Sequence, residues 1–182
     1  ITQVAGEIEY GLYDINTPYY KSSYEQEDDY SESIWLNGNW YYVQNGKIDW
    51  SVNTLSQVNG EGTWYKVTNG QLDWNYTGLT KYYSTWYMVT NGQVDWNFNN
   101  LTEYYGTWYY VENGKLNWNF TDLVYYYGTW YCVRSGVLDW NYTGLAYHAG
   151  GYYYIDHGVL DQNSSASSQS QPVNQSFVAN MS

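Results

Sequence analysis

The sequence of this 182-residue chain is poor in the residues that most often carry chemistry. It has one cysteine, Cys132, and two histidines. One cysteine can neither close an internal disulfide nor supply a zinc cluster. We find no nucleophile elbow, phosphate-binding loop or metal-ligand motif. We therefore expect no catalytic residue, no metal and no other cofactor.

Basic residues and long apolar runs are also scarce. Six Lys and Arg stand against eighteen Asp and Glu, which gives a net charge of −12. Because Lys and Arg make the contacts to phosphate groups, we expect neither nucleic acid nor an anionic membrane surface as a partner. No apolar run approaches the roughly 20 residues of a membrane-spanning helix, so we expect no membrane insertion. The acidic surface by itself indicates solubility.

Tyrosine and tryptophan, in contrast, are abundant. The chain has 26 Tyr and 11 Trp but only 3 Phe, and aromatic residues make up 22% of it. Buried indole N–H and phenol O–H groups need hydrogen-bond partners. Such residues are more typical of shallow stacks and binding surfaces than of a deep core.

A repeat of 22 residues organises most of the chain. It reads W-Y-x-V, two residues, Gly, two residues, [DN]-W, with a leucine five residues later. The first tryptophans of the copies are Trp40, Trp64, Trp86, Trp108 and Trp130, spaced by 24 and then by 22 residues. In the last copy Tyr152 takes the place of this tryptophan. The second tryptophans are Trp50, Trp74, Trp96, Trp118 and Trp140.

The repeat predicts a β-hairpin. Asn-Gly between apolar segments favours a type I′ turn, as at Asn69-Gly70, Asn91-Gly92 and Asn113-Gly114. W-Y-x-V and x-[LIV]-[DN]-W are then the two strands, and N-x-x-x-L is a connector to the next hairpin. Since a lone hairpin is marginally stable, we expect the copies to stack. The predicted fold is all-β, a β-hairpin repeat solenoid with 22-residue units.

The turn also predicts a strand register. With Asn113-Gly114 as the loop, Val111 pairs with Leu116 and Tyr109 with Trp118. Side chains alternate between faces along a strand, so these four share one face, which we predict to be the core. The second tryptophan of each repeat would then face the core.

The opposite face holds the first tryptophan and the residue two positions after it. That second position is Tyr110 in one repeat and Lys66, Met88 or Cys132 in others. Because it accepts such different side chains, we predict that it is exposed or at a rim. The first tryptophan, such as Trp108, would then lie on the more open face.

Composition divides the chain into three parts. Residues 1–34 are acidic and Tyr-rich, and we interpret them as an N-terminal leader or a degenerate repeat. Residues 35–161 are the tandem aromatic β-hairpin repeats. Residues 162–182 are rich in Ser, Gln and Asn, which is typical of a linker or tail and implies an attached domain in the parent protein.

The repeats resemble the cell-wall-binding repeats of Gram-positive surface proteins, which include choline-binding and glucan-binding families. The shared motif is G-[ST]-W-Y-Y-[LV] followed by a turn that ends in Gly, matched here from Gly106 to Gly114 and from Gly128 to Gly136. The resemblance implies a left-handed solenoid with ligands in aromatic cages between consecutive hairpins, on a secreted or cell-surface protein. Carried over by position, the candidate ligand-binding residues are Trp40, Trp64, Trp86, Trp108, Trp130, Trp74, Trp96, Trp118, Trp140 and Tyr110.

Two classes of ligand fit these residues. A quaternary ammonium group favours aromatic faces with carboxylates nearby, such as Asp73, Asp95 and Asp139. A sugar stacks its C–H face on one indole and forms hydrogen bonds with Asp, Asn and Tyr. We favour a glycan because Asp or Asn accompanies every internal Trp. For the Asp before each second Trp, a hydrogen bond within a turn or at a strand edge is nevertheless the simpler interpretation.

The predicted function is therefore non-catalytic binding of a cell-wall or extracellular polysaccharide, which targets or anchors an attached domain. That domain could belong to a larger enzyme, such as a wall hydrolase. Two alternatives remain open. One is a structural adhesin stalk in which the aromatic residues only stack, and the other is choline-type ligand binding in cages between hairpins.

Overall fold

The computed structural model describes residues 31–36, 39–44, 47–58 and 61–163. The predicted leader lies outside the described residues except for 31–34, and the predicted tail except for 162–163. Throughout the described residues the structure contains strands and turns, and it has no helix that could span a bilayer. The prediction of an all-β fold of 22-residue hairpin repeats is confirmed.

The chain forms two compact units, residues 1–95 and residues 96–182, which we describe separately. The strands of the first unit are β1 (Ser31–Leu36), β2 (Asn39–Gln44), β3 (Lys47–Ile48), β4 (Thr54–Val58), β5 (Glu61–Thr68), β6 (Gln71–Leu72), β7 (Gly78–Tyr82), β8 (Thr85–Thr90) and β9 (Gln93–Val94). The strands of the second unit are β10 (Asn100–Tyr104), β11 (Thr107–Glu112), β12 (Lys115–Leu116), β13 (Asp122–Tyr126), β14 (Thr129–Arg134), β15 (Val137–Leu138), β16 (Gly144–His148), β17 (Gly151–Asp156) and β18 (Val159–Leu160).

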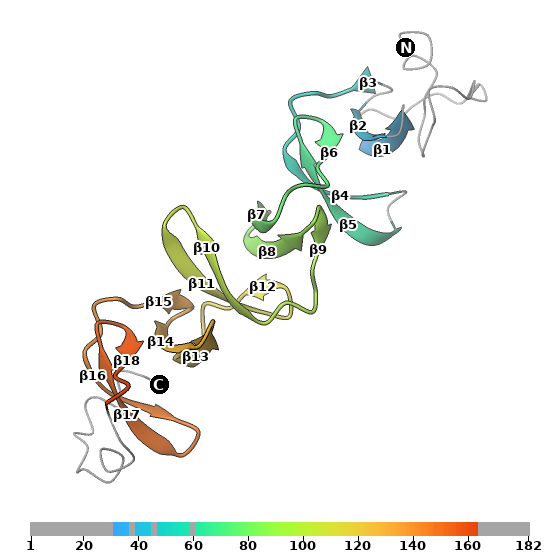
Figure 1. Cartoon of the computed structure of the whole chain (residues 1–182). Helices are drawn as coiled ribbons and strands as arrows, with labels where there is room; N and C mark the ends of the chain where they lie inside the picture. Colours follow the sequence, from blue (N-terminus) through green and yellow to red (C-terminus); the bar gives the residue numbers. More distant parts are fainter. Residues whose placement is uncertain (1–30, 37–38, 45–46, 59–60, 164–182) are drawn as a thin grey trace. The chain divides into compact units, whose positions relative to one another are not determined.

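Each repeat consists of a long antiparallel hairpin followed by one short strand (Figure 1). In the second unit, β10 pairs with β11 from Asn100 opposite Val111 to Tyr104 opposite Thr107. The short strand β12 then pairs with the end of β11, where Val111 lies opposite Leu116 as predicted. The predicted pairing stops there, because Tyr109 pairs with Val137 of β15 instead.

The segment predicted as a connector is in part a strand, so that prediction was wrong. Asp122–Tyr126 is β13, and it forms the long hairpin with β14. This hairpin turns at Tyr127 and Gly128, whose φ angles are 43° and 85°. Positive φ at tyrosine is uncommon and costs about 1–2 kcal/mol, so the sequence does not predict a turn at Tyr-Gly.

The Asn-Gly turns occur where the sequence predicts them. In the second unit Asn113 has φ 49° and Gly114 has φ 75°, and Ser135 and Gly136 have φ 49° and 77°. Two consecutive positive φ angles are what a type I′ turn requires. At Gly136 a second constraint applies, because a Cβ there would lie 2.5 Å from the carbonyl oxygen of Asn117 in the preceding repeat.

This close approach arises because each Asn-Gly turn packs against the repeat before it. The Gly136 N–H donates to the Phe120 carbonyl at 2.8 Å, and the Tyr110 N–H donates to the Gly136 carbonyl at 2.9 Å. The Ser135 N–H donates to the Thr121 hydroxyl oxygen at 2.9 Å. Backbone groups of the turn are thereby satisfied by the connector before β13 and by β11, and the bond from Tyr110 of β11 joins successive repeats within the unit.

The predicted core position at Val111 is confirmed, since Val111, Val133 and Ile155 are fully buried in the second unit. The prediction for the neighbouring position was wrong. Cys132 is fully buried, and Lys66 and Met88 in the first unit are 8% and 4% exposed. Both faces of the strand are therefore covered at this point.

The aromatic residue of the connector, at the second position of N-[YF]-[TN], packs on the side chain at this position and shields it from solvent. Tyr110 stacks on Phe120 with ring centroids 3.7 Å apart, and the Lys66 ammonium lies 5.2 Å from the centre of the Tyr76 ring. Cys132 belongs to one buried cluster with Tyr142. An aromatic face can accept a ring, a cation or a sulfur atom, which explains how one buried position tolerates such different residues.

Candidate functional site

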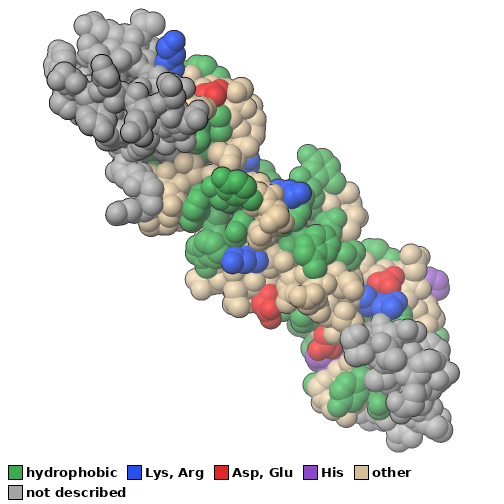
Figure 2. Space-filling model, turned by 180° about the vertical axis from the view of Figure 1, so that it is seen from behind, with side chains coloured by type: hydrophobic (Ala, Val, Ile, Leu, Met, Phe, Trp, Pro, Cys, Tyr) green, Lys and Arg blue, Asp and Glu red, His purple; other side chains and the backbone are tan. Residues whose placement is uncertain are grey.

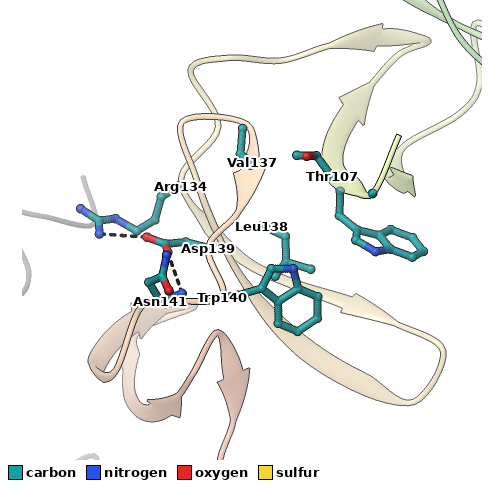
Figure 3. Close-up of a pocket in the computed structure, with 9 residues that line it drawn as sticks. Thr107, Arg134, Val137, Leu138, Asp139, Trp140 and Asn141 are labelled. Atoms are coloured by element: carbon teal, nitrogen blue, oxygen red, sulfur yellow. Dashed lines mark hydrogen bonds and ion pairs between the residues drawn. The ribbon is translucent and has the colours of Figure 1, made fainter. Parts of the chain in front are cut away.

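A groove of about 390 Å³ lies between two repeats of the second unit. It contains the start of β11 on one side and β15 with the turn that follows on the other (Figure 3). The lining residues are Gly106, Thr107, Trp108, Arg134, Val137, Leu138, Asp139, Trp140 and Asn141. Two predicted ligand-binding residues, Trp108 and Trp140, thus come together in one groove although they are far apart in the sequence.

One side of the Trp108 ring packs against the core. Its ring packs against Tyr126 of the next long hairpin with centroids 5.2 Å apart, and it borders the buried cluster around Leu101 and Val133. Like the other first tryptophans of the described residues, it is half-buried. Such an indole keeps a fixed position and still presents part of its surface to the groove.

Trp140 is more open, with 45% of its surface exposed. Its ring stands nearly perpendicular to that of Tyr131, with centroids 5.8 Å apart. The prediction that the second tryptophans face the core was wrong, since all five are between 41% and 57% exposed. The physical reason is that β15 ends at Leu138, so the chain leaves the sheet before Trp140.

Asp139 forms the turn that carries Trp140 outward. Its Oδ1 accepts the Asn141 N–H at 3.0 Å, and its Oδ2 lies 3.2 Å from the Arg134 guanidinium. Asp73 and Asp161 accept the N–H two residues later in the same way. The interpretation of these residues as turn formers is confirmed. At the groove, the carboxylate is in addition shared with a cation.

Arg134 is a groove residue that the sequence did not single out. It extends from the end of β14 and pairs with Asp139 (Figure 3). Its guanidinium also lies over the Tyr142 ring, 5.3 Å from the ring centre. The equivalent residues in other repeats are uncharged or acidic, for example Thr90 and Glu112. A positive charge that occurs in only one repeat at this position was the available signal. This groove thus contains one paired positive charge.

The other predicted site residues of the second unit have different surroundings. Trp130 packs against Tyr125 at 5.3 Å and against His148 at 4.8 Å. Trp118 stands edge-on to Tyr109 at 5.8 Å, and Trp96 has the Lys115 ammonium 5.9 Å from its ring. Tyr110 does not line the groove; it lies stacked on Phe120, and burial raises the pKa of its phenol.

The same two arrangements recur in the first unit. Trp64 packs against Tyr82 at 5.0 Å, as Trp108 does against Tyr126. Trp74 and Trp50 stand edge-on to Tyr65 and Tyr41, at 5.6 and 5.4 Å. Trp40 and Trp86 are half-buried. The local environment of each tryptophan therefore follows its place in the repeat.

Comparison with models of protein families assigns these repeats to a known family. The family model of the choline-binding repeat matches residues 37–49, 75–95, 97–117, 119–139 and 141–161, which is more than half of the chain. The chain belongs to the choline-binding repeat family. Repeats of this family bind choline-type ligands, are not catalytic in themselves and are typical of proteins associated with the cell surface.

Each of the last four choline-binding repeats begins just after a second tryptophan, and the first three of these four end just before the next one. One repeat therefore consists of a connector, a long hairpin and a short strand. Trp86, Trp108 and Trp130 lie inside matched segments, whereas Trp96, Trp118 and Trp140 fall between them. The groove combines an indole from inside one choline-binding repeat with an indole that stands between two others.

Among solved structures, the chain is similar to choline binding protein F from Streptococcus pneumoniae, with 24% identity over 79% of this chain and a TM-score of 0.30. It is also similar to CbpF in complex with ipratropium, obtained by soaking, with 26% identity over 81% of the chain and a TM-score of 0.32. In both cases it spans 44% of the solved chain. No curated protein sequence matches this chain.

Proposed function

We propose that this chain is a wall-targeting module, which binds choline groups of a cell-wall polymer in grooves between its repeats and holds an attached domain at the bacterial surface. The observation that carries the proposal is the groove between Trp108 and Trp140. It offers two indoles from different repeats to one small ligand, in a chain built of choline-binding repeats.

The chemistry of the groove suits a quaternary ammonium group. Such a cation gains about 0.5–2 kcal/mol from each aromatic face that it contacts. Trp140 presents an exposed indole, and the Asp139 carboxylate lies next to it in the sequence and lines the same groove. The net charge of −12 adds a general attraction for cations.

Repetition then converts weak binding into retention on a polymer. Once one groove is occupied, the next ligand along the same polymer binds at a high effective concentration. Binding to a surface that carries many choline groups can therefore be much tighter than binding of free choline. A targeting function needs tight attachment to the wall and only modest affinity at each site.

A neutral sugar is the second candidate for this groove, and Arg134 is the observation that favours it. Arg134 already neutralises part of the Asp139 charge. Together with Asn141, it provides N–H donors for sugar hydroxyl groups beside the Trp140 ring. A cation would be repelled by Arg134, whereas a sugar would not.

Titration of the intact chain with choline, followed by calorimetry, tests the proposal. Trp140→Ala should reduce the number of choline molecules bound per chain by one. Trp50→Ala is the matched control. Trp50 has the same edge-on tyrosine contact, but it belongs to the first W-Y-x-V repeat, so no earlier repeat supplies the partner tryptophan that Trp108 is to Trp140.

Sedimentation with bacterial cell walls that carry choline, and with walls from which choline has been removed, supplies the second readout. We expect retention on the choline-bearing walls and release by free choline. Equal retention on both kinds of wall would favour the sugar. No retention on either would contradict the targeting function and favour a structural stalk.

A further inference from the structure

The tips of the long hairpins carry exposed tyrosines. Tyr83 in the first unit and Tyr105 and Tyr127 in the second are 85%, 89% and 90% exposed. Each holds the first position of a two-residue turn, with φ of 50°, 47° and 43°. Hydrophobic side chains, a class that includes tyrosine, are visible on the molecular surface (Figure 2).

Neither folding nor burial explains these tyrosines. Residues with a Cβ atom are disfavoured at positive φ, so such positions are usually occupied by glycine, or by asparagine, which tolerates this conformation better than most residues. Ala149 adopts the same conformation, with φ 45°, at the tip between β16 and β17, so the turn does not need an aromatic ring. Backbone strain that recurs at equivalent positions, without gain in burial, indicates a function for the side chain.

Each tip ring is oriented by the tyrosine before it. The rings of Tyr104 and Tyr105 are nearly perpendicular, at 85°, with centroids 4.6 Å apart. The rings of Tyr126 and Tyr127 are arranged in the same way, at 80° and 4.6 Å. The edge-on contact fixes the ring, and an exposure near 90% leaves most of its surface open.

Two of these tips adjoin the Trp108–Trp140 groove. Gly106 follows Tyr105 in the turn and itself lines the groove. On the other hairpin, Trp108 contacts Tyr126, and Tyr126 contacts Tyr127. Aromatic contacts therefore lead from the groove to the tip of the next hairpin, so a polymer with one group in the groove would extend toward these rings.

We propose that Tyr105 and Tyr127 are sugar-binding subsites, which stack on neutral sugar rings of the polymer whose choline group lies in the groove. The inference rests on the proposed function and adds a second ligand class to it. A phenol ring offers its face to sugar C–H groups and its hydroxyl to sugar hydroxyl groups. The segments 103–107 and 125–129 contain no basic residue that would attract phosphate, and the Glu103 carboxylate accepts the Gly106 N–H within the turn.

The test uses the intact chain with Tyr105→Asn and Tyr127→Asn, singly and together. Asparagine tolerates positive φ, so the turns should persist. Ala149→Tyr is the reverse variant, because it places a ring on a tip that lacks one. The probes are free choline, a choline-bearing wall polysaccharide, and the same polysaccharide after removal of its choline.

We expect each asparagine variant to bind free choline normally and to bind the choline-bearing polysaccharide about threefold to tenfold more weakly, as for loss of one aromatic contact. Ala149→Tyr should gain affinity by a similar factor. The choline-free polysaccharide should bind weakly to the unmodified chain and to Trp140→Ala, and not to the double asparagine variant.

The tip subsites are refuted if the asparagine variants bind both polysaccharides as the unmodified chain does. They are equally refuted if the affinity of these variants for free choline falls as much as their affinity for the polysaccharide, since the tips would then be part of the choline site. If free choline does not bind at all but the tyrosines still govern binding of the choline-free polysaccharide, the proposed choline function fails and the subsites stand.

Discussion

The Ser135 N–H donates to the Thr121 hydroxyl oxygen at 2.9 Å, and this hydrogen bond joins the turn between β14 and β15 to the connector that precedes β13. The same bond recurs in the second unit between His157 and Thr143, and between Asn113 and the side-chain oxygen of Asn99. A polar residue at the third position of N-x-[TN] therefore has a structural role, because it holds the turn before the short strand against the connector.

Thr121→Val should weaken this junction. The valine has nearly the same shape but leaves the Ser135 N–H without its acceptor, and we expect a loss of about 0.5–1.5 kcal/mol in the free energy of unfolding. Thr121→Ser keeps the hydroxyl and serves as the control. Urea unfolding of both variants measures the effect; equal stability of Thr121→Val and the unmodified chain would show that the bond contributes nothing.

Gly136→Ala should be far more damaging than Gly150→Ala. Both glycines have positive φ, at 77° and 88°. A Cβ at Gly136 would meet the Asn117 carbonyl oxygen at 2.5 Å, whereas one at Gly150 would meet nothing within 4 Å. We expect losses of about 3 kcal/mol or more and about 1 kcal/mol, respectively. Thermal unfolding would contradict the close approach if the two variants were equally stable.

Arg134→Gln should tighten choline binding in the groove. The substitution removes a positive charge and releases the Asp139 Oδ2 from its ion pair. We expect the affinity of this groove for choline to rise about threefold to tenfold at low salt, and less at high salt because of screening. Calorimetry at two salt concentrations measures both effects. A loss of affinity would show that Arg134 itself holds the ligand.

Lys66→Met should stabilise the first unit. Burial lowers the pKa of Lys66, against the smaller opposing effect of the Asp73 carboxylate. The folded state thus disfavours the charged form relative to the unfolded state. This cost is present at neutral pH and disappears as the pH rises from the folded pKa to the ordinary value of 10.5.

For Lys66→Met we expect a gain of about 1 kcal/mol at pH 7, decreasing toward pH 10.5. The methionine imitates Met88 at the equivalent position. Lys81→Met, at an exposed lysine of the same unit, should change stability little. Chemical unfolding between pH 7 and 10.5 checks the trend, and a constant difference between the Lys66 variant and the unmodified chain would contradict it.

Cys132 should be unreactive while the chain is folded. Its side chain is fully buried, and burial raises the pKa of its thiol to about 12, with a further contribution from Asp139. Because the thiolate is the reactive form, we expect no alkylation at pH 8 without denaturant and complete alkylation in urea. Mass spectrometry measures this; rapid labelling of the folded chain would mean that the Cys132 cluster opens readily.

The sequence was most informative where structure depends on neighbouring residues. Asn113-Gly114 fixed a turn and, with it, the pairing of Val111 with Leu116. The alternation of side chains between the two faces of a strand was misleading where it was continued beyond the Val111–Leu116 pair. The strand β12 ends at Leu116, so Trp118 leaves the sheet and becomes exposed, and the predicted core face did not include it.

Residue variability was a poor guide to burial in these repeats. Lys66, Met88 and Cys132 vary at one position and yet are buried. The partners that explain this, such as Tyr76 for Lys66, come from a connector whose packing cannot be read from strand alternation. The strand β13 was missed for a related reason, since its turn depends on a tyrosine with positive φ.

By itself, the sequence determined the 22-residue period, the Asn-Gly turns, the all-β fold and the family resemblance, because these depend on local turn chemistry and on repetition. Only the tertiary structure decided which indole is exposed, which residues share the Trp108–Trp140 groove and which tyrosines stand at the tips. Those features depend on where each strand ends and on how one repeat packs against the next, and these contacts link residues that are well separated in the chain.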